Sequence, residues 1–83
     1  MAEIQVTFHS KAEIKVLAQI YSGFTLVSSC FVDPGQIRSL LADSLRLDIF
    51  FKDSATGWEI ARKLDSATES FTLSGKKGNY ILT

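Results

Sequence analysis

Residues 45–64, "LRLDIFFKDSATGWEIARKL", carry the pattern that decides the fold. Through the first eight positions every second side chain is apolar, and the residues between them are polar except Phe50, which predicts a β-strand with one buried face. The letters "DSATG" then supply turn residues, and a second run of strand-forming residues follows. We expect a β-hairpin in which Trp58 and Ile60 compete for the core while Phe50 points the other way. The residues expected on the buried face of the first strand are Leu45, Leu47, Ile49 and Phe51.

Two segments fit a helix as well as a strand. In residues 34–43, Asp33 could cap a helix that begins at Pro34. In residues 57–64, Thr56 and Glu59 have the spacing of a capping box. We favour strands in both segments, because their neighbours are strands with short connections and a helix of two turns is marginal on its own. A short helix at 34–43 stays open as the alternative.

The remaining segments repeat the strand pattern with turn residues between them. Residues 3–9 and 13–21 alternate, and residues 22–32 do so if a bulge near Ser28 and Ser29 restores the register. Two further short strands follow near the end of the chain, with "GKKG" as their hairpin tip. The chain therefore predicts an all-β fold, a small antiparallel β-sandwich or barrel-like domain of about 7–8 short strands over residues 1–83.

Charge and cysteine content limit the partners and the compartment. Nine basic residues balance nine acidic ones, so no net field attracts nucleic acid, which we do not expect as a partner. The single cysteine, Cys30, and the absence of a secretory leader in "MAEIQVTFHSK" favour the cytoplasm, with export by an unconventional route left open. No stretch reaches the roughly 18 apolar residues of a transmembrane segment.

Few residues suit catalysis or metal binding. His9 is the only histidine and falls on the polar face of its strand, while Cys30 lies in an apolar strand and is expected to be buried. One His and one Cys do not make a zinc site, and the spaced aspartates are expected to form turns. We expect no enzyme, no cofactor and no metal. A hydrolase that combines His9 with a serine or Cys30 is the least favoured hypothesis.

Aromatic side chains that alternate out of phase with the core are the main positive feature. They predict a non-catalytic binding module that associates with itself or with a protein partner. A membrane- or glycan-binding effector of lectin-like or lytic type, which would use a lipid or glycan surface, is the alternative. The basic "GKKG" tip resembles a phosphate loop only in composition, because no helix follows it. The candidate binding residues are Trp58, Phe50, Tyr21, Lys76 and Lys77.

Overall fold

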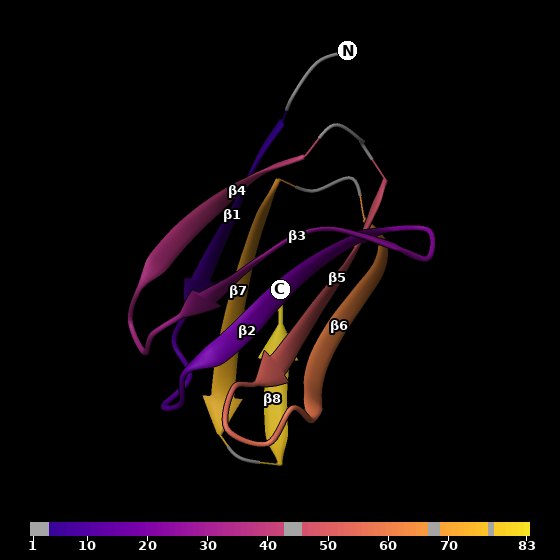
Figure 1. Cartoon of the computed structure of the whole chain (residues 1–83). Helices are drawn as coiled ribbons and strands as arrows, with labels where there is room; N and C mark the ends of the chain where they lie inside the picture. The colour runs from indigo at the N-terminus through magenta and orange to yellow at the C-terminus, as the bar shows by residue number, and fades with distance from the viewer. Residues whose placement is uncertain (1–3, 43–45, 67–68, 77) are drawn as a thin grey trace.

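The computed structural model describes residues 4–42, 46–66, 69–76 and 78–83, and it confirms an all-β sandwich. Eight strands form two four-stranded sheets that stack face to face, and the described residues contain no helix (Figure 1). In the two segments with a helical alternative, residues 37–42 and 59–64 are strand, and the residues before them, 34–36 and 57–58, are turn or irregular. The strands are β1 (Ile4–Ser10), β2 (Val16–Ser22), β3 (Thr25–Val32), β4 (Ile37–Ala42), β5 (Leu47–Asp53), β6 (Glu59–Ser66), β7 (Ser70–Lys76) and β8 (Asn79–Leu82).

The strand order is β4-β1-β7-β8 in one sheet and β3-β2-β5-β6 in the other. Neighbouring described strands pair antiparallel, except that β1 and β7 run parallel. The parallel pair joins the beginning of the chain to its end, and Phe8 lies directly beside Phe71. Local alternation carries no information about such a pairing, because parallel neighbours are separated by a long connection.

The inner faces of the two sheets make one core of small and medium apolar side chains with three phenylalanines at its centre. The alternation in residues 16–20 predicts the buried face of β2, since Val16, Ala18 and Ile20 are fully buried. Other fully buried apolar residues also lie on the predicted faces. They are Val6, Phe8, Ile49, Phe51 and Leu73.

A bulge in β3 lies where the sequence required one. Ile20 pairs with Ser28 and Tyr21 with Leu26, so Val27 is the extra residue, one position before the expected Ser28. A bulge moves every later side chain to the opposite face, which places Val32 in the core and leaves Phe31 outside. The turn that follows has Gly35 at φ 77°, the positive φ that the third residue of a type II turn requires, and Gln36 N donates to Asp33 O across it.

The expected core position of Trp58 is wrong. Its side chain is 75% exposed, and Leu64, which the same alternation placed inside, is exposed as well. The pairing of β5 with β6 is irregular at two places, between Leu47 and Ile49 and again between Phe51 and Lys52. These irregularities break the period of two in β6, so Ala61, and not its neighbours, lies opposite Phe51. The predicted contribution of Leu45 to the core lies outside the described residues.

Candidate ligand-binding cleft

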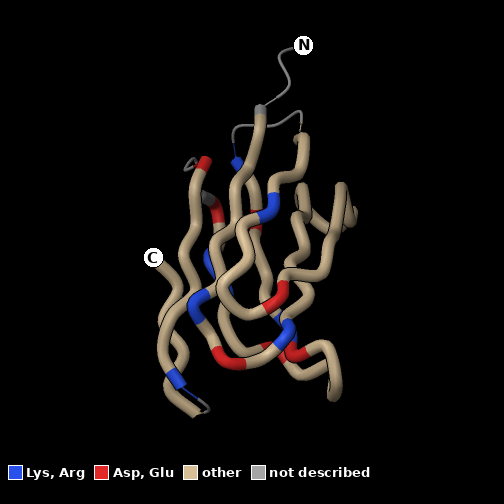
Figure 2. Tube along the Cα trace, turned by 90° about the vertical axis from the view of Figure 1, so that its left-hand side faces the viewer, with Lys and Arg blue, Asp and Glu red and all other residues tan. Residues whose placement is uncertain are grey.

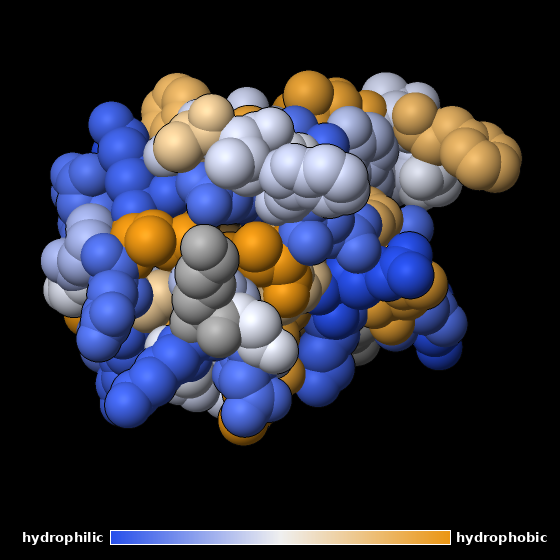
Figure 3. Space-filling model, turned by 90° about the horizontal axis from the view of Figure 1, so that it is seen from below, coloured by the Kyte–Doolittle hydropathy of each residue, from blue (hydrophilic) through white to orange (hydrophobic). Residues whose placement is uncertain are grey.

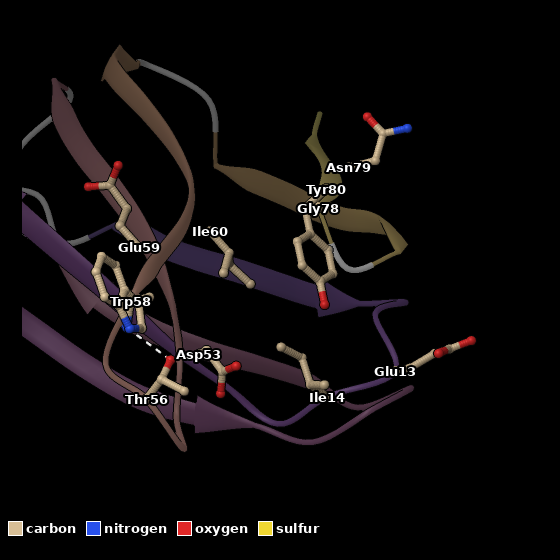
Figure 4. A pocket seen from close by; sticks show the side chains of 10 residues that line it. All are labelled: Glu13, Ile14, Asp53, Thr56, Trp58, Glu59, Ile60, Gly78, Asn79 and Tyr80. Atoms are coloured by element: carbon tan, nitrogen blue, oxygen red, sulfur yellow. Dashed lines mark hydrogen bonds between the residues drawn. The ribbon is translucent and has the colours of Figure 1, made fainter.

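A cleft of about 740 Å³ opens at one end of the sandwich (Figure 4). It lies between the β1–β2 connection, the β5–β6 turn and the β7–β8 hairpin. Seen from this end, apolar atoms lie between hydrophilic side chains (Figure 3). The cleft is therefore the open end of the core, bordered by three connections that are far apart in the sequence. The lining residues are Glu13, Ile14, Asp53, Thr56, Trp58, Glu59, Ile60, Gly78, Asn79 and Tyr80.

Hydrogen bonds within the β5–β6 turn hold Trp58 at one end of the cleft. Asp53 Oδ1 accepts from the backbone N–H of Ala55 at 2.8 Å, and Asp53 O accepts from Gly57 N at 2.8 Å. The N–H of Trp58 donates to Thr56 Oγ1 at 3.2 Å, and Trp58 O accepts from Asp53 N at 2.8 Å. A turn with this many internal bonds fixes the backbone of Trp58 while its indole stays in solvent.

The floor of the cleft is apolar. Ile14, Ile60 and Tyr80 point toward one another across it (Figure 4), and all three pack against the buried core while staying partly exposed. Tyr80 pairs with Gly75, whose φ of 100° and missing side chain let the backbone of β8 approach closely. The floor thus offers aliphatic and aromatic surface together with one hydroxyl.

The described lining of the cleft includes three acidic residues and no basic one. Asp53 is hydrogen-bonded to Trp58 through the backbone, whereas Glu13 and Glu59 point away from the floor (Figure 4). Glu59 Oε2 also forms an ion pair with Arg62 Nε at 3.3 Å, on the outer side of β6. Along the rest of the described trace, basic and acidic residues are interspersed (Figure 2). The described part of the lining is therefore acidic, on a chain with balanced charge.

The structure separates the predicted binding residues into two places. Trp58 borders the cleft, and Lys76 ends β7 at the hairpin that forms its far side. Tyr21 and Phe50 lie instead on the outer face of the β3-β2-β5-β6 sheet, where their rings meet edge to face with centroids 5.3 Å apart. The predicted role of Lys77 lies outside the described residues.

This outer face, which we call the aromatic face, is defined by Leu17, Gln19, Tyr21, Phe31 and Phe50. Phe31 is half exposed, with Lys15 Nζ 5.0 Å from the centre of its ring. Gln19 is only 9% exposed although it points away from the core, and its Oε1 has no hydrogen-bond partner in the described part of the chain. The aromatic face therefore already shields a polar acceptor from water.

A hollow of about 320 Å³ lies at the edge of the aromatic face. Phe24, in the turn between β2 and β3, borders it and is itself fully exposed. Figure 1 shows this turn reaching beyond the body of the sandwich. The hollow is lined by Tyr21, Gly23, Phe24, Asp48, Phe50, Lys52 and Glu59.

The histidine and the cysteine are not brought together. His9 pairs with Ile37 on the outer face of one sheet, whereas Cys30 pairs with the buried Ala18 on the inner face of the other. Burial raises the pKa of the Cys30 thiol, and the nearby Arg38 opposes that shift. Cys30 is half-buried, so the expected full burial is only partly met.

Neither a metal site nor a membrane-spanning helix is found in the described ranges. Over these residues, no three His, Cys, Asp or Glu side chains gather to hold a metal ion. In the same part of the chain, no helix has the length and apolar character that a membrane crossing needs.

Sequence reasoning missed most of the cleft. The alternation in the sequence indicates a core position for Ile14 and Ile60 and a short strand around Tyr80, and it does not indicate a binding site. Asp53 was expected to form a turn, which it does, but its place beside Trp58 depends on how the turn is oriented. The exposure of Phe24 could have been predicted, because an aromatic residue that follows Gly23 in a turn does not belong to the buried face of a strand.

No protein-family model, no curated protein and no solved structure matches this chain.

Proposed function

We propose that the protein is a non-catalytic binding module that takes a cationic group of its ligand in the cleft. The observation that carries this proposal is that the exposed indole of Trp58 and the carboxylate of Asp53 line one cleft, together with an apolar floor. An ammonium or guanidinium group is attracted by the face of a tryptophan ring and by a carboxylate, and its aliphatic stem suits an apolar floor. Acidic lining disfavours anionic ligands by the same reasoning.

Trp58 is the only tryptophan, so its fluorescence reports directly on ligands in the cleft. We expect butylammonium and butylguanidinium to change the emission saturably, in about the millimolar range for ligands this small. Butyrate, which has the same stem and the opposite charge, is the matched control and should not saturate. Equal responses to butyrate and butylammonium would contradict the proposed charge selectivity.

The variant Asp53→Asn tests the role of the carboxylate while keeping the oxygen that accepts from Ala55. Loss of one partly screened charge should weaken butylammonium binding roughly two- to fivefold. Phe24→Ala, which removes an exposed aromatic residue outside the cleft, should leave the binding unchanged. An unchanged affinity in Asp53→Asn would remove this residue from the proposal.

A neutral glycan is the second candidate ligand. Trp58 supplies a flat face for a sugar ring, and Thr56 and Asn79 add neutral hydrogen-bonding groups to the lining. A glycan array tested with wild type and Trp58→Ala separates the two candidates. Binding of a neutral glycan that is lost in Trp58→Ala, without a response to butylammonium, would favour the glycan.

We also infer that the chain associates with itself through the aromatic face. The proposal is supported by the apolar surface that this face and its edge leave in solvent, where Phe31 is half exposed and Phe24 is fully exposed. Removing such apolar surface from water between two copies favours association. Light scattering over a range of concentrations measures this association, and a strictly monomeric protein would contradict it.

A further inference from the structure

We propose that two copies pair about a two-fold axis, with Phe24 of each copy inserted into the hollow of the other. This proposal rests on the self-association proposed above and names the contact that would produce it. It concerns the aromatic face and its edge, whose hollow shares only Glu59 with the described lining of the cleft.

The first observation is that a projection and a recess lie on the same face. Phe24 has 104% relative exposure, so nothing in its own chain covers the ring. The hollow that it borders measures about 320 Å³, and a cavity of about 150 Å³ is enough to hold benzene. A patch that carries both a knob and a hole can face a copy of itself, because each knob meets a hole across the axis.

The second observation is the kind of wall that the hollow offers. Tyr21 and Phe50 form one side with their edge-to-face pair at 5.3 Å, so an entering phenyl ring would meet aromatic surface. Aromatic anchors that fill pockets at the centre of an interface are the usual sites of high binding energy. The shielded Gln19 lies next to this wall, since it pairs with Phe50 across β2 and β5.

The third observation is the charge around the hollow. Asp48 and Glu59 are acidic and Lys52 is basic, so the rim presents both signs. Two copies that meet across a two-fold axis can place the lysine of one rim against a carboxylate of the other. The formal net charge of the chain is zero at pH 7, so the two copies do not repel each other as whole molecules.

The test measures dimer dissociation for wild type, Phe24→Ala and Trp58→Ala by sedimentation equilibrium. Phe24→Ala should fold normally because it removes a fully exposed side chain. It should raise the dissociation constant roughly 30-fold or more, as expected for an interface anchor. Trp58 is also an exposed aromatic residue, but it does not line the hollow, so Trp58→Ala should change the dissociation constant by no more than about twofold.

The possible results distinguish the contact made by Phe24 from self-association in general. A wild-type dimer that survives Phe24→Ala would overturn the knob-in-hollow contact and leave self-association intact. A wild type that stays monomeric would overturn both. If the monomer instead binds phosphatidylcholine vesicles and Phe24→Ala abolishes that binding, Phe24 serves a lipid surface, and the second copy is the wrong occupant.

Discussion

Phe8 of β1 and Phe51 of β5 meet edge to face in the core, with ring centroids 5.5 Å apart and ring planes at 86°. The two strands belong to different sheets, so this contact joins the layers of the sandwich. Phe71 of β7 stacks with Phe8, with ring centroids 5.9 Å apart. One phenylalanine therefore links its own sheet and the opposite sheet at once.

Replacing Phe8 by alanine should destabilise the fold by about 3–5 kcal/mol, because the variant loses buried aromatic surface and leaves a cavity. Small domains have only about 5–15 kcal/mol of stability, so the urea midpoint should fall sharply. Phe24→Ala, measured at a concentration where the protein is monomeric, is the control and should change stability by no more than about 0.5 kcal/mol. Similar losses in both variants would contradict the placement of Phe8 at the centre of the core.

Ser10→Ala should leave stability unchanged or raise it by up to about 1 kcal/mol. The Ser10 hydroxyl is fully buried and has no hydrogen-bond partner within the described ranges. Removing it therefore loses no bond, while the backbone of residue 10 keeps its contacts to Gly35 and Gln36. Chemical denaturation of the two proteins gives the difference. A clear destabilisation would mean that the hydroxyl has a partner after all.

Gly75→Ala should destabilise the protein by about 1 kcal/mol or more beyond Gly23→Ala. Both glycines have positive φ, so both variants incur backbone strain. A Cβ at Gly75 would also collide with the backbone of Asn79 and Tyr80 in β8, whereas one at Gly23 would meet open space. Thermal unfolding of the pair compares the costs, and equal losses would argue against the close approach of β8.

Cys30 should react slowly with a disulfide reagent near neutral pH. Burial raises its pKa, so the reactive thiolate is scarcer than in an unhindered cysteine at the same pH. The thiol form is favoured in the folded state, so its contribution to stability is fully present below the unfolded pKa and is lost as pH rises through the folded pKa. Rates with a thiol-specific chromogen between pH 7 and 10, compared with glutathione, check this. A rate equal to that of glutathione at pH 7 would contradict it.

The sequence predicts the parts of the fold in which alternation and burial agree. In β2 and β5 every second residue is apolar and faces the core, so both strands and their faces could be assigned from local pattern alone. In β6 the pairing irregularities beside Phe51 shift the faces, and the sequence shows this only as the charged Arg62 in an apolar series. The exposure of Trp58 could not be predicted for this reason.

The cleft could not be predicted because it is a product of topology. Its floor joins Ile14 from the β1–β2 connection, Ile60 from β6 and Tyr80 from β8, and each of them has the local pattern of a core residue. Only the stacking of the two sheets brings them to the same end. The Tyr21–Phe50 pair, in contrast, follows from two strands whose outer faces were assigned correctly.

The most direct test of the proposed binding cleft is an NMR titration of the ¹⁵N-labelled chain with butylammonium. We predict that the amide shifts that change saturably cluster in the three connections around the cleft, at residues 13–14, 53–60 and 78–80. Butyrate at the same concentrations should leave these signals in place. Changes confined to the aromatic face around Tyr21 and Phe50, or the same response to both compounds, would contradict a cation-binding cleft beside Trp58.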